Sequence, residues 1–357
     1  MYAFCRCKGL TTVVIGNGLT SIGDAAFNNC SSLTSINIPE SVKSIGNGAF
    51  GGCSGLTSIT IPEGVTSIGD VTFSGCSSLT SFTIPESVKS IGSGVFEGCI
   101  GLTSITIPES VSSIENYTFG NCSNLVRVEL NSNTIVAKEY SSSSSINKIF
   151  GSQVKEYILG DNVKSIGDYA FYGCNGLTAI TIPSSITDIG EGAFSGCSSL
   201  SAITIPESVT SFGDDAFSDC NNMETIIYLS ASPFILEKAI FPAQFMTGGT
   251  LYVPAGARQT YVERGWNMYF CNIVELGDDP THVNSVAAES GTQVLFNNGS
   301  IMVQGADDDT LIQVFDLNGR LIGQTKAAAT GTTKIAVPAG EKMLIVKVGD
   351  KSVKVLR

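Results

Sequence analysis

Apolar residues recur along this chain in fixed columns, and the pattern of columns repeats every 23 residues. Within one repeat, Leu33 is followed by Ile36 and Ile38, and a polar residue separates the two isoleucines. This alternation is typical of a short β-strand with one buried face. Pro39 follows directly, and it ends the strand because proline lacks the N–H group that a neighbouring strand would need. We therefore expect one short strand in each repeat.

The remainder of each repeat returns the chain to the core. Val42 and Ile45 are followed by Gly46, which permits a sharp turn, and then by the apolar pair Ala49 and Phe50. One such unit cannot bury its apolar side alone, whereas stacked units bury a continuous core between them. The repeat therefore predicts a mainly β solenoid.

Cysteine marks the period. The cysteines on this 23-residue ladder are Cys7, Cys30, Cys53, Cys76, Cys99, Cys122, Cys174, Cys197 and Cys220. Gly151 takes the place of a missing cysteine, and extra residues fall near the segment EYSSSSSIN, so about ten units start between residues 7 and 220. Stacked strands lie about 4.8 Å apart, farther than the Cβ–Cβ distance of a disulfide, which is about 3.5–4.5 Å. We expect buried thiols on the ladder, while Cys5 and Cys271 lie off it and are freer to react.

The repeat GLTSITIPEGVTSIGDVTFSGCSS resembles the leucine-rich repeat family, in particular its bacterial, BspA-like surface-protein branch. The resemblance covers about residues 2–230. The segment TGGTLYVPAGARQTYVERGWNMYFCNIVEL resembles the part that closes such arrays, with Tyr252, Trp266 and Phe270 over the last open face of the core. The resemblance implies a leucine-rich repeat solenoid at 1–276 that is secreted or exposed on the cell surface.

The 23-residue period ends near Pro280, and we expect a linker at 277–284. Short alternating runs follow, with turn signals such as Asn318-Gly319 between them, and they predict a small β-sandwich at 285–357. The segments IQVFDLNGRLI, VPAG and IVKVGDKSVKVLR resemble the C-terminal sorting domain of secreted Bacteroidetes proteins, although GEKMLIVKV lacks that family's tyrosine. The alternative is a plain terminal β-domain that guards the end of the solenoid.

Residues 2–7 already match the end of a repeat, so we expect a further segment, with a possible secretion signal, before residue 1. Hydrophobic residues make up 43% of the chain and the net charge is −12. The negative charge argues against general nucleic-acid binding and against electrostatic attachment to anionic lipid. No apolar run reaches the roughly 18 residues of a membrane helix, so direct membrane insertion is not expected.

Residues for catalysis are scarce. The single histidine, His282, lies in the expected linker, whereas a Ser-His-Asp or Cys-His site needs a histidine held beside its nucleophile. The cysteine spacing does not fit zinc, and the G-x-G-x-x-G match at Gly46–Gly51 lies in a repeat turn without a following helix. No pair of unlike carboxyl groups stands out, as a glycosidase would need. We expect no enzyme activity and no cofactor.

Two polar columns follow the period. Glu40, Glu63, Glu86 and Glu109 form one of them. It is interpreted as a solvated acidic row, and the alternative is loose capture of Ca²⁺ by clustered carboxylates. The other comprises Asp24, Asn47, Asp70, Ser93, Asn116, Asp168, Glu191 and Asp214. We expect these side chains to cap turns by bonding to local backbone N–H groups.

The outward positions of the predicted strands form a flat, uncharged row of hydroxyl groups. Its members include Ser58, Thr60, Ser81, Thr83, Ser104 and Thr106. Such a face has few of the aromatic or arginine side chains that dominate tight interfaces. It favours weak, multivalent contact with glycans or extended proteins.

The irregular centre of the array breaks this row. Arg127, Glu129, Lys155 and Glu156 replace the hydroxyl residues, and the loop with Tyr140 and Ser141–Ser145 is expected to project from the same place. Insertions in repeat arrays often bind partners, so we predict recognition here. The alternative is a tolerated insertion without a partner.

The predicted function is a non-enzymatic adhesion or protein-binding module that recognises host, matrix or cell-surface proteins, as the family resemblance implies. The alternative is a carbohydrate-binding protein that uses the Ser/Thr-rich strand face. A hydrolase is the third possibility, and any turnover abolished by a carboxylate substitution would favour it.

Overall fold

The computed structural model describes residues 2–236, residues 240–276 and shorter segments beyond them. Those segments are residues 293–297, 300–304, 310–315, 321–327, 332–336, 343–348 and 351–356. The chain divides into two compact units, Met1–Ile273 and Val274–Arg357, and each unit is described by itself. The predicted linker at 277–284, with His282, lies outside the described residues.

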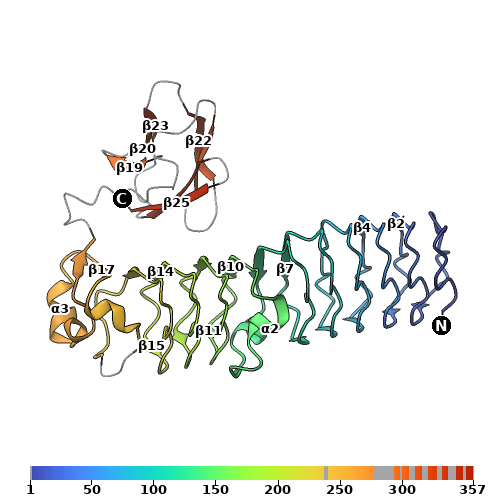
Figure 1. The fold of residues 1–357 in the computed structure, drawn as a ribbon, viewed down its shortest axis with the longest axis horizontal. Coiled ribbons are helices and arrows are strands. Elements are labelled where there is room, and N and C mark those ends of the chain that lie inside the picture. Colours follow the sequence, from blue (N-terminus) through green and yellow to red (C-terminus); the bar gives the residue numbers. More distant parts are fainter. Residues whose placement is uncertain are drawn as a thin grey trace. The chain divides into compact units, whose positions relative to one another are not determined.

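The first unit is a mainly β solenoid, as predicted, and its turns follow one another as a row (Figure 1). The predicted strands pair in parallel along one side, which we call the strand face, and Ser35 lies opposite Ser58 in the next turn. These strands are β2 (Ser35–Ile36), β4 (Ser58–Ile59), β7 (Ser104–Ile107), β9 (Arg127–Leu130), β10 (Glu156–Leu159), β12 (Ala179–Thr181), β14 (Ala202–Ile205), β16 (Thr225–Tyr228) and β17 (Thr250–Val253). β18 (Ile273–Glu275) begins at the last residue of this unit.

Most turns contain a second, two-residue strand that the sequence did not predict. These strands pair in parallel as a second ladder, for example with Ser67 opposite Ser90. They are β1 (Ser21–Ile22), β3 (Ser44–Ile45), β5 (Ser67–Ile68), β6 (Ser90–Ile91), β8 (Ser113–Ile114), β11 (Ser165–Ile166), β13 (Asp188–Ile189) and β15 (Ser211–Phe212). In every one of these strands except β15, a buried isoleucine faces the core and the residue before it is mostly exposed; β15 has the half-buried Phe212 in that place.

The third side of each turn runs from Gly46 to Cys53 or its equivalents, and we call it the turn face. Its phenylalanines stack from Phe4 to Phe150, with ring centroids 5.0–5.7 Å apart in successive turns. The ladder thiols lie beneath the turn face and donate to carbonyl groups of the preceding turn, as Cys53 does to Phe27 at 3.1 Å. The columns predicted to be buried form one continuous core.

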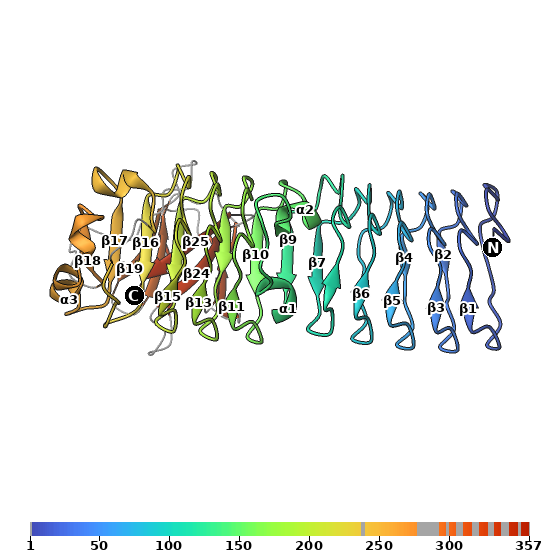
Figure 2. The same ribbon diagram turned by 90° about the horizontal axis from the view of Figure 1, so that it is seen from below.

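Two short helices replace regular structure where the extra residues lie. α1 (Asn133–Val136) contacts both β8 and β11 and takes the place of a second-ladder strand between them. α2 (Ile146–Phe150) lies on the turn face, because its Phe150 continues the phenylalanine stack. The two helices lie at opposite edges of the row of turns in Figure 2. The insertion therefore spans the corner between the second ladder and the turn face.

The last turns of the solenoid are closed by aromatic side chains. This segment contains η1 (Ala243–Met246), α3 (Arg258–Glu263) and η2 (Trp266–Met268). Tyr252, Trp266 and Phe270, which were expected to cover the core, are all buried. The indole Nε1 of Trp266 donates to the carbonyl of Phe234 at 2.9 Å, so the ring is held by a hydrogen bond as well as by packing.

The described part of the second unit consists of antiparallel strands in two sheets. One sheet has the order β19 (Gln293–Asn297), β20 (Ser300–Gln304) and β23 (Thr332–Ala336). The other has the order β22 (Leu321–Lys326), β21 (Leu311–Phe315), β24 (Met343–Val348) and β25 (Lys351–Leu356). Buried residues from both sheets, such as Ile301 and Val346, belong to one apolar cluster. The β-sandwich and its role as a sorting domain stay predictions.

Within the described residues, no helix has the length and apolar character that crossing a membrane requires.

Candidate functional site

The outward residues of the strand face are exposed as the alternation predicts. Ser58 and Thr60 flank the buried Ile59, and Ser104 and Thr106 flank Ile105 in the same way. Ser81 and Thr83 are exposed too, although their segment forms no strand. The face carries no charged side chain in these turns, so it can offer hydroxyl groups and little else to a partner.

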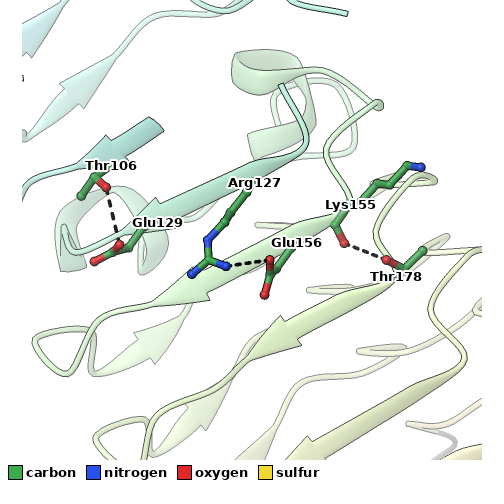
Figure 3. A network of polar contacts seen from close by, with 6 residues as sticks. All are labelled: Thr106, Arg127, Glu129, Lys155, Glu156 and Thr178. Carbon is green, nitrogen blue, oxygen red and sulfur yellow. Dashed lines mark hydrogen bonds and ion pairs between the residues drawn. The ribbon is translucent and has the colours of Figure 1, made fainter. Parts of the chain in front are cut away.

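Four charged residues interrupt this row on β9 and at β10. Figure 3 shows Arg127 directed toward Glu156, and Nη1 of Arg127 lies 3.2 Å from Oε2 of Glu156. Glu129 turns to the other side, where it accepts hydrogen bonds from Oγ1 of Thr106 at 3.5 Å and from Nδ2 of Asn131 at 3.1 Å. The side chain of Lys155 extends away from the ion pair (Figure 3).

The strand register explains this arrangement. Arg127 lies opposite Glu156 across the pair β9–β10, and Glu129 lies opposite Thr106 across β7–β9. Because parallel strands are about 4.8 Å apart, aligned side chains of opposite charge meet. The side chains of Arg127 and Glu156 remain 51% and 38% exposed, so their attraction is screened by solvent. Together with Lys155 and Glu129 they form a charged patch without net charge, which we call the central patch.

The structure corrects the prediction for Tyr140 and its loop. Tyr140 is buried, its hydroxyl donates to the carbonyl of Ile135 at 2.9 Å, and Nζ of Lys138 lies 5.3 Å from its ring centroid. The loop leaves the solenoid at the corner between the second ladder and the turn face, and not beside the central patch, because α1 has already taken the chain away from the strand face. Ser141–Ser143 are exposed at this separate place.

The acidic column Glu40, Glu63, Glu86 and Glu109 is exposed along its whole length. Nζ of Lys43 bonds to the backbone carbonyl of Glu40 at 3.2 Å and not to its carboxylate, whereas the carboxylate of Glu109 accepts from Asn162 at 2.7 Å. Across the described residues, no group of three or more His, Cys, Asp or Glu side chains could hold a metal ion. The geometry therefore provides no coordination set for the calcium hypothesis.

The polar turn column does bond to backbone N–H groups, but the groups belong to the next turn. Oδ1 of Asp24 accepts from the backbone N–H of Asn47 at 3.0 Å, and Oδ1 of Asn47 accepts from Asp70 at 2.9 Å. Glu191 donates its backbone N–H to Asp168 at 2.7 Å in the same manner. These side chains tie successive turns together, where local capping within one turn was expected. The column is a structural device of the stack.

The ladder thiols from Cys30 to Cys220 lie in the core and are not reactive centres. All cysteines are free, and those from Cys30 to Cys220 on the ladder are buried. Burial raises the pKa of the Cys53 thiol to about 12, so little thiolate forms near neutral pH. Cys271 is exposed as expected, but Cys7 is exposed as well, although it belongs to the ladder and was expected to be buried.

Solved structures that resemble this chain are leucine-rich repeat proteins of bacteria. A leucine rich cell surface protein from Faecalibacterium prausnitzii A2-165 is 30% identical over 81% of this chain and 85% of that chain, with a TM-score of 0.33. A leucine-rich repeat protein from Eubacterium ventriosum ATCC 27560 is 26% identical over 74% and 72%, with a TM-score of 0.36. The Leucine Rich Repeat protein of T. pallidum is 24% identical over 59% and 77%, with a TM-score of 0.33.

No curated protein matches this chain. The family described as "BspA type Leucine rich repeat region (6 copies)" matches residues 1–126, 44–153 and 147–243, and these ranges together cover most of the solenoid. The matched residues include the repeating columns that build its three sides. The chain belongs to the BspA-type leucine-rich repeat family.

Proposed function

We propose that this solenoid is a non-enzymatic, extracellular or cell-surface adhesion module that binds host, matrix or cell-surface proteins. The observation that carries the proposal is the strand face, whose outward residues are exposed from Ser58 to Thr106 and which carries charge mainly at the central patch. A flat row of hydroxyl groups supports many weak contacts, and a charged pair at its centre adds directional ones. Membership of a leucine-rich repeat family supports the proposal, because proteins with this fold commonly serve as interaction scaffolds.

The central patch is proposed to set specificity. Arg127 and Glu156 neutralise each other in the unbound protein, so a partner has to offer a matching acid and base to compete for them. A partner with the wrong pattern of charge would leave one of the two charges unpaired on binding, which is unfavourable. Glu129 and Lys155 enlarge the patch on either side. The uncharged turns beside it would supply contact area.

A binding screen of the full chain against extracellular-matrix proteins, with and without Ca²⁺, tests this proposal. For a partner found in the screen, the double variant Arg127→Ser, Glu156→Ser should weaken binding by about tenfold or more. The matched control is Lys43→Ser, which removes an exposed charge between β2 and β3, outside the central patch, and should leave binding unchanged. Binding that survives the double variant would contradict recognition at the central patch.

Carbohydrate binding is the second candidate, and it is favoured by the exposed hydroxyl groups of Ser58, Thr60, Ser104 and Thr106. A glycan array separates it from protein binding. Glycan binding that falls in the double variant Ser58→Ala, Thr60→Ala and persists in the double variant Arg127→Ser, Glu156→Ser would support carbohydrate binding by the strand face. No glycan signal, together with a matrix-protein partner, would leave the adhesion module as the function.

A further inference from the structure

Except where α2 replaces it, the turn face of each unit holds the chain in a left-handed conformation at two places. One lies two residues after the stacked phenylalanine and is filled by residues that tolerate positive φ, such as Gly52 and Asn121. The other lies two residues before the phenylalanine, and glycine fills it in several turns, as at Gly94 and Gly192. Ala25, Val71 and Asp215 take this second place in three other turns, and tyrosine takes it at Tyr2, Tyr117 and Tyr169.

Tyr117 and Tyr169 have φ of 61° and 52°, where a bulky side chain is disfavoured by its own backbone. Tyr117 is 61% exposed, so its packing contacts offset little of the backbone strain. The neighbouring turns show that glycine is compatible with the position. An exposed aromatic ring at a strained position suggests a role other than folding.

The two rings lie close together on the solenoid. They belong to the turns on either side of α2, whose Lys148 occupies the same column, two residues before Phe150. The backbone N–H of Tyr117 donates to the carbonyl of Lys148 at 2.6 Å. At a turn spacing of about 4.8 Å, Tyr117 and Tyr169 are about 10 Å apart along the array. One extended segment of a partner can therefore reach both rings.

Tyr169 is half-buried, packs against the core with part of its ring, and is held in place before any partner binds. Its hydroxyl donates to the carboxylate of Glu191, and the ring of Tyr172 meets it edge-on at 5.8 Å between centroids. Its ring also covers Gly192, since a Cβ built there would lie 2.6 Å from Cε1 of Tyr169. A ring that is already oriented loses little conformational entropy on binding.

Charge selects the partner. The exposed acids of the turn face on either side of α2 are Glu97, Glu115, Glu139 and Glu191, with Asp168 half-buried, against the two bases Lys138 and Lys148. Carboxylates beside tyrosine rings attract cations, which can also lie over the accessible ring faces. The chain itself contains one such contact, between Lys138 and Tyr140.

We propose that Tyr117 and Tyr169 form a docking surface for an arginine-rich or lysine-rich segment of a partner protein. The surface lies on the turn face and is separate from the strand face, so it goes beyond the proposed function and adds a second binding side to the array. The cation of the partner lies over a tyrosine ring and pairs with a neighbouring carboxylate. Lys148, between the rings, opposes this binding and limits its strength.

The test measures the Kd of the full chain for an immobilised peptide of alternating arginine and glycine, at physiological salt. The double variant Tyr117→Gly, Tyr169→Gly should weaken binding by about tenfold. Tyr117→Gly alone should not lower the melting temperature, because its ring is exposed and glycine relieves the left-handed strain. The control is Val71→Gly, which removes an exposed apolar side chain from the same left-handed column away from α2 and should bind as the parent does. Lys148→Gln should tighten binding.

Three outcomes would overturn the proposal. They are unchanged binding in the tyrosine double variant, equal weakening in Val71→Gly, and a fall in melting temperature in Tyr117→Gly that shows the Tyr117 ring to be structural. A Tyr117→Asn, Tyr169→Asn variant repeats the test with a residue that tolerates positive φ. The Arg127→Ser, Glu156→Ser variant should bind the arginine peptide normally, so failure of this surface is distinguishable from failure of the strand face.

Discussion

Removal of one hydroxyl group should stabilise this protein. Tyr157, in β10, occupies the inward column that isoleucine or valine fills in most other turns, and its ring lies between Phe150 and Phe171 at centroid distances of 6.2 and 5.0 Å. The residue is fully buried, and its hydroxyl finds no hydrogen-bond partner among the described residues. The variant Tyr157→Phe removes this oxygen and keeps the ring.

The size of the effect follows from the burial. A buried polar group without a partner costs about 1–3 kcal/mol. The nearest candidate acceptor is the thiol of Cys174, whose sulfur accepts at most a weak hydrogen bond from this hydroxyl and offsets part of this cost. We expect Tyr157→Phe to raise the free energy of unfolding by about 0.5–2 kcal/mol.

The matched control is Tyr228→Phe. The Tyr228 hydroxyl donates to the backbone carbonyl of Val209 at 2.6 Å, so its removal leaves a buried carbonyl without that bond. This variant should lower the free energy of unfolding by about 0.5–1.5 kcal/mol. The same chemical change is therefore expected to have opposite signs at two buried positions of one array.

Urea unfolding of the full chain, followed by circular dichroism, measures both variants. The midpoint and the slope are compared separately, because repeat arrays can unfold in parts and a changed slope would signal lost cooperativity. A Tyr157→Phe variant that is less stable than the parent by more than about 1 kcal/mol would refute the reasoning. It would mean that the hydroxyl is satisfied in the core, and a double-mutant cycle with Cys174→Ala would identify sulfur as the acceptor.

The ladder thiols yield the remaining predictions. Cys99→Ala removes the Sγ–H bond to the Phe73 carbonyl, 3.2 Å long, and leaves a small cavity, so urea titration should show a loss of about 1–2 kcal/mol. Iodoacetamide at pH 8 should label Cys7 and Cys271 in the folded chain, and the buried ladder thiols from Cys30 to Cys220 only after unfolding, as mass spectrometry would show. Burial raises the pKa of Cys99 far above its ordinary value of 9.0, so the unfolded chain loses this proton first. Stability should therefore fall as pH rises above about 9, and a titration that shows no fall between pH 8 and 10 would contradict this.

Most of the first unit could be predicted because its local pattern recurs. A single L-x-x-I-x-I segment such as Leu33–Ile38 is weak evidence for a strand, but the same columns in successive units leave few other ways to bury them. The second ladder was missed because a strand such as Ser44–Ile45 contains one buried residue and shows no alternation. Its existence depends on the turns on either side, which supply the hydrogen-bond partners.

The candidate site was also predictable from the sequence only in part. Arg127 and Glu156 could be recognised as departures from the Ser/Thr row, yet their pairing depends on the strand register across the insertion. The insertion was visible in the sequence as extra residues, but the side of the solenoid on which it lies was not. Tyr140 was expected beside the central patch and lies buried at another corner, because α1 first carries the chain across the second ladder.

Composition and period are properties of neighbours along the chain, and they were enough to specify strand, turn and core columns in each unit. The contacts between units join residues that are far apart along the chain, 23 positions for Asp24 and Asn47 and 26 for Cys53 and Phe27, and no local pattern records them. Asp24 therefore bonds to Asn47 in the next turn, and the Cys53 thiol bonds to Phe27 in the one before. The unpartnered hydroxyl of Tyr157 and the exposed ring of Tyr117, on its left-handed backbone, likewise follow from how the units stack. Stacking determines which side chains find a partner and which remain exposed.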